Sequence, residues 1–173
     1  MEYAIRSAVM GDAAALLAIY APYVTDTCVS FEESPPSPDA FAGRLRESLD
    51  QYAWLVCEVR REIVGYAYAT AYRARAAYRY SASTSVYIKV GYHRQGIGHA
   101  LYEALFERLK TLGIYTLVAG IALPNPASVG LHKAMGFAEV GVYRSVGYKF
   151  GRWQDTLALQ KALRVYDTPA DKA

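Results

Sequence analysis

The stretch Val86-Tyr87-Ile88, followed after a short loop by His93-Arg94-Gln95-Gly96-Ile97-Gly98-His99-Ala100, decides the fold. It predicts a strand over residues 83–88, two glycines, and a long amphipathic helix over residues 96–112. Glycine lets the backbone come close to a ligand, and the first N–H groups of a helix have no helical acceptor. Together with the helix dipole, these groups form a site for a pyrophosphate. Taken alone, the pattern indicates an ordinary helix start equally well.

The glycine pair matches neither of two common nucleotide-binding patterns. Gly96 is not part of a Gly-x-x-x-x-Gly-Lys-Ser/Thr phosphate loop. The third glycine of a dinucleotide fingerprint is also missing at the required spacing. The ligand class must therefore come from the rest of the chain.

Patterns on both sides of this stretch predict alternating strands and helices. In chain order they are a strand over 3–7, a helix over 13–20 capped by Asp12 and ended near Pro22, a helix over 38–49, a hairpin of 54–59 and 63–72, a strand over 117–122, a helix over 128–135 closed by Gly136, and an antiparallel pair between 138 and 160. One α/β crossover in an otherwise antiparallel order implies an α/β fold with a mixed sheet covered by helices. We expect one domain over residues 1–165 and a loose tail over 166–173.

The composition limits the partners. A chain of 173 residues with 53% hydrophobic residues can bury one substantial core. The net charge of +3 is too small to favour nucleic acid, although it suits an anionic cofactor. Cys28 and Cys57 match neither a disulfide framework nor a metal site, so we expect reduced thiols, no metal and a cytoplasmic location. Neither a signal peptide nor an apolar run of about 18 residues is present, so we expect no membrane partner.

A second motif, Asn125-Pro126-Ala127-Ser128-Val129-Gly130-Leu131-His132-Lys133-Ala134-Met135-Gly136-Phe137, follows the glycine pair by about thirty residues. By itself it predicts a capped helix with a glycine stop and His132 on its surface. The two motifs together resemble the GNAT acetyltransferase superfamily. The resemblance is greatest to its phosphinothricin and methionine sulfoximine acetyltransferase branch. It extends over nearly the whole chain, through the further segments Trp54-Leu55-Val56, Ser85-Val86-Tyr87, Leu123-Pro124-Asn125 and Gly147-Tyr148-Lys149-Phe150-Gly151 with Trp153 and Asp155.

The resemblance implies the GNAT fold, in which a mixed, mostly antiparallel twisted sheet carries helices on both faces and its central strands splay apart. Those strands correspond to residues 83–88 and 117–122, and the pantetheine arm of acetyl-CoA would lie between them. The implied cofactor-binding residues are Val86, Tyr87 and Ile88 on the strand, Arg94, Gln95, Gly96, Ile97, Gly98 and His99 at the pyrophosphate, and Asn125 and Ser128 across the arm. The chain departs from the family at His93, where Gln or Arg is usual, and we expect weaker side-chain help with the phosphates there.

The same resemblance implies an N-acetyltransferase that moves the acetyl group of acetyl-CoA to an amine. His132 stands where many relatives carry a tyrosine, and it is the candidate acid for the CoA sulfur. Ser83 stands where the branch carries a glutamate base, and a serine cannot accept a proton usefully at neutral pH. Proton removal then falls to water, to Glu32 or Glu33, or to no group if the amine arrives neutral.

The loop over residues 72–80 resembles the acceptor-binding segment of the branch. Arg73 and Arg75 would hold an acceptor carboxylate, and Phe31 and Tyr78 would supply apolar walls. Without the resemblance, this loop is simply a solvated basic loop. The acceptor is then a small amino-acid-like amine of the phosphinothricin or methionine sulfoximine type. Acetylation of protein N-termini and acyl-CoA binding without catalysis are the alternatives, and a homodimer is the partner that the branch suggests.

Overall fold

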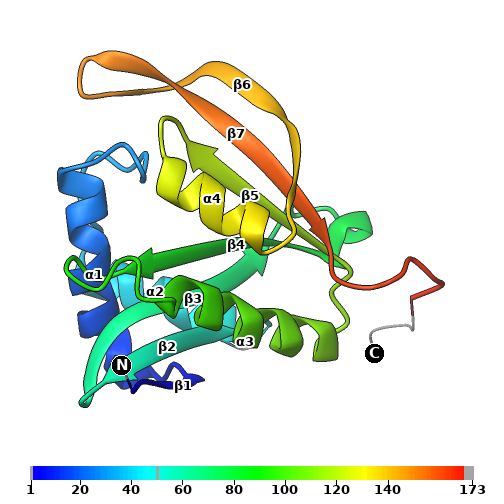
Figure 1. The fold of residues 1–173 in the computed structure, drawn as a ribbon, viewed down its shortest axis with the longest axis horizontal. Helices are drawn as coiled ribbons and strands as arrows, with labels where there is room; N and C mark the ends of the chain where they lie inside the picture. The colour runs from blue at the N-terminus through cyan, green and yellow to red at the C-terminus, as the bar shows by residue number, and fades with distance from the viewer. Residues whose placement is uncertain (1, 50, 170–173) are drawn as a thin grey trace.

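The protein, described over residues 2–49 and 51–169 by a computed structural model, is built on one seven-stranded sheet (Figure 1). The strand order is β1-β2-β3-β4-β5-β7-β6. The strands are β1 (Ala4–Ser7), β2 (Trp54–Val59), β3 (Glu62–Ala71), β4 (Ser81–Ile88), β5 (Thr116–Ala122), β6 (Ala138–Lys149) and β7 (Arg152–Ala162). Within the described residues, every neighbouring pair is antiparallel except β4 and β5. The predicted mixed, mostly antiparallel sheet is therefore confirmed.

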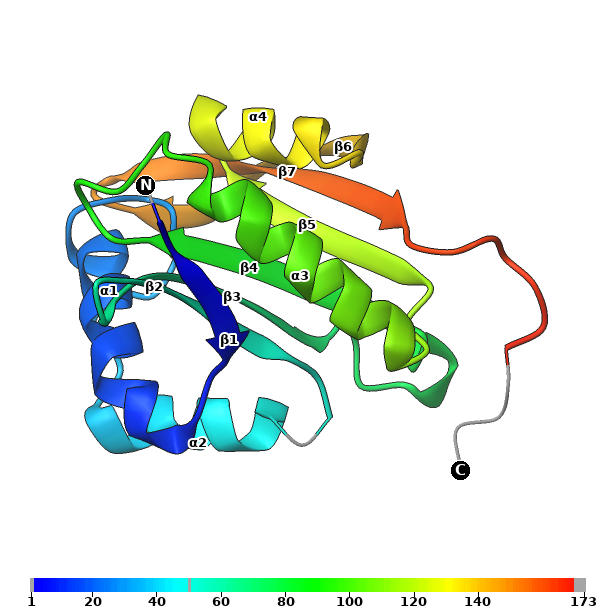
Figure 2. The same cartoon turned by 60° about the horizontal axis from the view of Figure 1, so that its bottom comes forward.

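Helices cover both faces of this sheet, with α3 and α4 on one side and α1 and α2 on the other (Figure 2). The α-helices are α1 (Ala13–Thr25), α2 (Pro38–Leu49), α3 (Ile97–Thr111) and α4 (Pro126–Ala134), and short 3-10 turns form η1 (Met10–Asp12) and η2 (Ala76–Tyr78). No helix among the described residues is long and apolar enough to cross a bilayer.

Two helix ends differ from the sequence prediction. Helix α1 runs past Pro22 to Thr25, because a proline within a helix removes one N–H donor but still leaves its own carbonyl free to accept the N–H of Asp26. The Asp12 carboxylate does not cap this helix; it accepts hydrogen bonds from Arg6 and from the Val9 N–H. Helix α4 begins two residues before the predicted start, with Asn125 as its cap.

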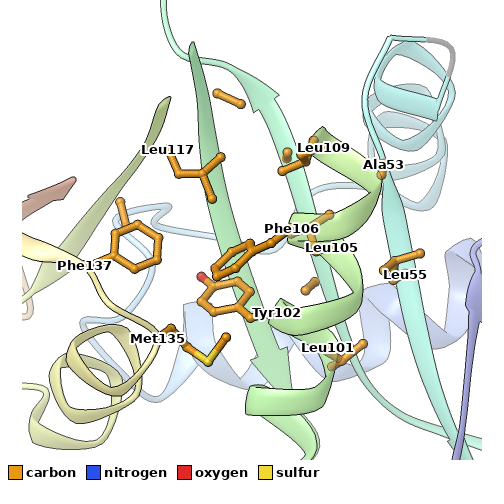
Figure 3. Close-up of a cluster of buried hydrophobic side chains, with 14 of the residues drawn as sticks. Ala53, Leu55, Leu101, Tyr102, Leu105, Phe106, Leu109, Leu117, Met135 and Phe137 are labelled. Carbon is orange, nitrogen blue, oxygen red and sulfur yellow. The ribbon is translucent and has the colours of Figure 1, made fainter. Parts of the chain in front are cut away.

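The larger core lies between the sheet and α3. Leu101, Leu105 and Leu109 of α3 are fully buried, as the leucine stripe predicted. Figure 3 shows Tyr102 and Phe106 on the same helix, with Met135 and Phe137 facing them from the end of α4. These contacts hold α3 and α4 side by side across the end of the β4–β5 pair.

The β4–β5 pair is short. It joins Ser81 to Thr116, Ala82 to Leu117 and Ser83 to Val118, and then the two strands separate while β5 continues along β7 to Ala122. Within residues 2–49 and 51–169, the carboxyl-terminal half of β4 therefore has no strand on its β5 side. This is the splayed central pair that the resemblance to the GNAT superfamily implied.

The chain end is only partly the loose tail expected over residues 166–173. The Tyr115 hydroxyl donates to Asp167 at 2.6 Å, and Tyr166 lies 3.1 Å from the Thr116 hydroxyl. Residues 170–173 lie outside the described residues.

Candidate active site

The gap beside β4 exposes backbone groups that suit an extended ligand. The Lys89 N–H donates to the Val64 carbonyl, which makes this a hydrogen-bonded pair of the β3–β4 ladder. Such pairs alternate along an antiparallel ladder, so the N–H and C=O groups of Thr84, Val86 and Ile88 point away from β3. The parallel Ser83–Val118 pair occupies the Thr84 N–H, so the groups that face the gap are the Thr84 carbonyl and the main-chain groups of Val86 and Ile88. An amide-containing arm placed there can form strand-like hydrogen bonds, as expected for pantetheine at Val86.

Ile88 differs from the other two positions. The Tyr23 hydroxyl of α1 donates to the Ile88 carbonyl at 2.5 Å and lies 3.4 Å from its N–H. Burial raises the pKa of Tyr23, so this hydroxyl stays protonated and keeps its donor. The Tyr23 hydroxyl thus occupies the predicted Ile88 contact, and the free groups are the Thr84 carbonyl and both main-chain groups of Val86. No sequence pattern distinguished Tyr23 from the other tyrosines.

The start of α3 lies next to this gap. Gly96 caps the helix in a left-handed conformation with φ of 80°, which glycine adopts without strain. The following N–H groups, at residues 97–99, have no acceptor within the helix. Arg94 and Gln95 are exposed beside them. The geometry fits a pyrophosphate bound mostly by main-chain donors, as the sequence indicated.

Gly98 and Asn125 have packing roles at the same place. A methyl group on Gly98 would lie 3.1 Å from a Leu131 methyl carbon, so the glycine lets α3 approach α4. Asn125 accepts the Ser128 N–H at 3.1 Å and caps α4. Asn125 and Ser128 therefore fix the start of the helix that borders the gap.

His132 is buried, with 3% of its surface exposed, rather than on the helix surface. Its Nδ1 lies 2.8 Å from the Ser128 carbonyl oxygen, so Nδ1 carries the proton and donates it there. Its Nε2 then accepts the hydroxyl hydrogen of Tyr102, at 3.0 Å. Burial lowers the pKa of His132, so the ring is neutral near pH 7. Both ring nitrogens are thus hydrogen-bonded, and the side chain that His132 contacts through Nε2 is that of Tyr102.

Tyr102 connects this histidine to β4. It is fully buried, and burial raises its pKa, while Thr84 of β4 lies close enough to oppose that rise. Thr84 is the first residue of β4 beyond the last β5 pair. Polar groups therefore follow one another from Thr84 at the opening of the gap through Tyr102 to His132, and the hydrogen bond among them is the one between Tyr102 and His132; Thr84 Oγ1 has no hydrogen-bond partner among the described residues. Sequence reasoning missed Tyr102, because its position belongs to the apolar stripe of α3.

Ser83 lies at the point where the gap opens. It pairs with Thr70 on one side and Val118 on the other. Side chains alternate along a strand, so Ser83 faces the same side as Tyr87, which packs with the α1 and α2 layer. The predicted site of proton removal is thus on the opposite sheet face from His132.

Glu32 lies on that face as well. Its carboxylate pairs with Arg44 of α2 at 2.6 Å, while its other oxygen, Oε2, is buried without a hydrogen-bond partner among the described residues. Burial raises the pKa of Tyr68, and the nearby Glu32 carboxylate adds to that rise. Tyr68 also interacts with Ser85, two residues along β4 from Ser83. Glu33 is exposed.

The four predicted acceptor contacts fall into two groups. The Arg73 guanidinium lies 5.0 Å from the Tyr72 ring centre and 5.5 Å from that of Tyr78, in the loop just before β4. Arg75 precedes η2 in the same loop and is exposed. Phe31 instead packs on Gly147 of β6, so closely that a methyl group at Gly147 would overlap its ring. Within one chain, Phe31 and the arginine loop lie at opposite ends of the β4–β5 pair.

The described residues contain no group of three or more His, Cys, Asp or Glu side chains suited to a metal ion.

A sheet that splays beside a glycine-capped helix start fits an acetyl-CoA-dependent acyltransferase, and the chain belongs to the GNAT acetyltransferase family. The family model described as the acetyltransferase (GNAT) domain matches residues 5–158. The predicted fold, cofactor and enzyme class are thereby confirmed.

Within this family the chain is similar to enzymes that acetylate small amines. It is 43% identical to the phosphinothricin N-acetyltransferase of Alcaligenes faecalis over 91% of this chain and 81% of that protein. It is 34% identical to the L-methionine sulfoximine/L-methionine sulfone acetyltransferase of Pseudomonas aeruginosa over 92% of this chain and 94% of that protein. The crystal structure of a phosphinothricin acetyltransferase from Sinorhizobium meliloti in complex with AcCoA superimposes with a TM-score of 0.94 at 34% identity, covering 99% of this chain and 95% of that one. The chain is an N-acetyltransferase that uses acetyl-CoA.

Proposed function

We propose that the protein acetylates the α-amine of a small amino-acid-like acceptor of the phosphinothricin or methionine sulfoximine type. The observation that carries this proposal is the placement of Ser83, at the opening of the gap, directly after a loop that holds Arg73 and Arg75. An amine at Ser83 would lie beside the thioester, and its own carboxylate would lie toward the arginines. Charge-assisted hydrogen bonds from arginine fix such a carboxylate strongly.

Proton removal from the amine is assigned to Glu32. Its Oε2 is buried and has no hydrogen-bond partner in the part of the chain that the structure describes, and the Arg44 pair holds the carboxylate in place. Glu32 would work directly or through one water, since the side chain at Ser83 is too short and too weakly basic to do so. This assignment gives the role of the glutamate that the branch carries at the position of Ser83 to a glutamate of the α1–α2 loop.

Proton delivery to the sulfur is assigned to the Tyr102–His132 pair. When acetyl-CoA is bound, it supplies an activated acetyl group and a thiolate leaving group. A thiol pKa near about 8.5 means that this leaving group needs only modest help near neutral pH. At rest the Tyr102 hydroxyl donates its hydrogen to His132 Nε2. To protonate the sulfur, this hydroxyl would turn from Nε2 toward the departing thiolate, and the tyrosinate left behind would take a proton back from solvent.

We further propose that the chain forms a homodimer in the cytoplasm. Strand β6 lies at the edge of the sheet, and Val142, Tyr143, Val146 and Tyr148 are exposed on it. Exposed apolar side chains along an open edge favour a covering partner. Within its own chain, Phe31 does not reach the loop of Arg73 and Arg75. In a dimer, a second copy would place apolar side chains beside this loop. The free Cys28 and Cys57 suit a reducing compartment.

The test is release of CoA with a panel of amino acids and their analogues. The wild type should acetylate acceptors that carry a free carboxylate and fail with the matching amides. Glu32→Gln should lower turnover by about tenfold or more, whereas Glu33→Gln, a neighbouring change at an exposed site, should not. Ser83→Glu should raise turnover most at low pH. An enzyme that releases CoA with none of the panel, or is indifferent to Glu32→Gln, contradicts the proposal.

A further inference from the structure

The turn that connects β4 with α3 passes beside α1 (Figure 1), and two hydrogen bonds join them. The Tyr23 hydroxyl donates to the Ile88 carbonyl at 2.5 Å and lies 2.9 Å from His93 Nε2. A hydroxyl has one hydrogen, and here the carbonyl receives it. His93 Nε2 must therefore carry a hydrogen and donate it to the Tyr23 oxygen. The reaction described above gives His93 no role.

Both the backbone and the ring of Tyr23 are held in place. Tyr23 lies in the last turn of α1, just beyond Pro22. The Thr27 hydroxyl donates to the Tyr23 carbonyl at 2.6 Å. The Tyr23 ring meets the Tyr87 ring edge to face, with ring centres 5.2 Å apart, an arrangement that aromatic pairs favour. The Tyr23 hydroxyl is therefore a fixed acceptor for His93.

The turn over residues 89–96 has a backbone shape that other contacts must stabilise. Gly96 has a φ of 80°, and Arg94, two residues earlier, has a φ of 61°. For a residue other than glycine, this left-handed conformation is unfavourable, so it persists only where the surrounding structure holds it. His93 directly precedes Arg94, and its hydrogen bond to Tyr23 is one of the contacts that hold it.

A second set of contacts holds the other side of the same turn. The Tyr92 hydroxyl donates to the Glu62 carboxylate at 3.1 Å, and the Lys89 ammonium pairs with that carboxylate too. Tyr92 and His93 are consecutive residues, yet the first is bonded to the start of β3 and the second to α1. The turn is thus fixed to two different elements before the chain reaches Gly96.

The placement of this turn decides where the first N–H groups of α3 lie. These groups, at residues 97–99, follow the turn directly, while the main-chain groups of Val86 precede it. One acetyl-CoA molecule can use both sets only when they stand at the separation that its pantetheine arm spans. If the turn is correctly placed for only a fraction of the time, the apparent Kd of acetyl-CoA rises in inverse proportion to that fraction.

We propose that Tyr23 and His93 are positioning residues for acetyl-CoA: the hydrogen bond between them fixes the turn so that the N–H groups at the start of α3 face the gap. Neither side chain needs to touch the cofactor. His93 then serves to bond α1 rather than to contact a phosphate. Glutamine, which is usual at this position in the family, also ends in an N–H donor and can form the same hydrogen bond. The inference concerns the cofactor and holds for any acceptor.

The test is the Kd of acetyl-CoA, measured by calorimetry without an acceptor. His93 is exposed, so His93→Ala should fold, and its Kd should rise about fivefold. His93→Gln restores an N–H donor and should return the Kd to within about twofold of the wild type. Tyr23→Phe should raise the Kd at least as much as His93→Ala, because it removes the hydrogen bonds to both Ile88 and His93. Since both changes break one shared hydrogen bond, the double variant should bind no more weakly than Tyr23→Phe alone.

Tyr20→Phe is the matched control for Tyr23→Phe. Tyr20 lies on the same helix, its ring also packs against Tyr87, and its hydroxyl is hydrogen-bonded to Ser30 at 2.7 Å. Urea unfolding should show that both variants are less stable than the wild type, whereas only Tyr23→Phe should bind acetyl-CoA more weakly. An equal loss of affinity in the two variants would mean that general destabilisation is the cause, and the positioning role would be wrong.

The remaining outcomes are equally decisive. An unchanged Kd in His93→Ala, no recovery in His93→Gln, or additive effects in the double variant would refute the proposal. Tighter binding of acetyl-CoA by Tyr23→Phe would also refute it, because the hydroxyl would then compete with the cofactor for Ile88. If the Kd values follow the expected pattern but no small amine is acetylated, the positioning role stands and only the proposed acceptor class fails.

Discussion

Removing one buried hydroxyl, with Tyr102→Phe, tests the polar groups that follow one another from the gap to His132. The Tyr102 hydroxyl donates to His132 Nε2 at 3.0 Å, and both side chains are buried. The variant keeps the ring and its packing but leaves Nε2 as a buried acceptor without a donor. Such a loss costs about 1–3 kcal/mol, so the free energy of unfolding should fall by that amount.

Turnover should fall as well, and by more than acetyl-CoA affinity, since the hydroxyl is assigned to proton delivery. The assays are urea unfolding followed by circular dichroism, and CoA release at saturating acceptor. Tyr143→Phe removes a hydroxyl from a tyrosine that is 57% exposed, and it serves as the control. If Tyr102→Phe is no less stable than Tyr143→Phe, the hydrogen bond to Nε2 is not formed in solution. If stability falls while turnover is unchanged, the pair is structural and proton delivery belongs to solvent.

Three further changes follow from the same geometry. Burial holds the pKa of His132 below its usual 6.5, so between the two pKa values the unfolded chain binds more protons than the folded one. The free energy of unfolding should therefore fall as the pH drops below about 6.5, by at most about 1.4 kcal/mol per pH unit. His132→Asn should flatten this pH dependence, measured by urea unfolding between about pH 7.5 and pH 5.5. His99→Glu places a negative charge in the first turn of α3. Calorimetry should show acetyl-CoA binding about tenfold weaker at low salt and a smaller effect at high salt. An effect independent of salt would argue against a phosphate at this helix end. Lys149→Met removes two buried hydrogen bonds to the carbonyls of Val24 and Ser30, at 2.6 and 2.7 Å. The free energy of unfolding should fall by about 3 kcal/mol. A loss below about 0.5 kcal/mol would show that water replaces the two hydrogen bonds.

The fold could be predicted because its decisive elements have strong local patterns. The leucine stripe of α3, the glycine before it and the alternating strands each have a period or a stop signal that neighbouring residues determine. The end of α1 was predicted wrongly at Pro22, because a proline removes only one hydrogen bond and the packing of Val24 in the core outweighs it. Helix ends depend on such small differences in energy.

The candidate site could be predicted at its backbone and less well at its side chains. Glycines and a helix start indicate a phosphate site because the binding groups are main-chain N–H groups, which do not depend on the surrounding side chains. The partners of His132 and Glu32 come from other helices, Tyr102 from α3 and Arg44 from α2. Tyr102 looks like one more member of an apolar stripe, and Arg44 like a solvated charge. Only their three-dimensional placement gives them a role, and no single sequence records that.

The short pairing of β4 with β5 also has a consequence for how the chain exchanges its amide protons. Beyond Thr84, the amide of Val86 faces neither β3 nor β5, although it lies in the middle of the sheet. Central strands normally exchange slowest with deuterated solvent, because opening them requires global unfolding. The Val86 amide should instead exchange as fast as that of a loop in the free protein, while its neighbours at Ser85 and Tyr87 remain protected. Acetyl-CoA should slow the exchange of this amide selectively, so that the middle of the sheet is fully protected only while the enzyme holds its acetyl donor.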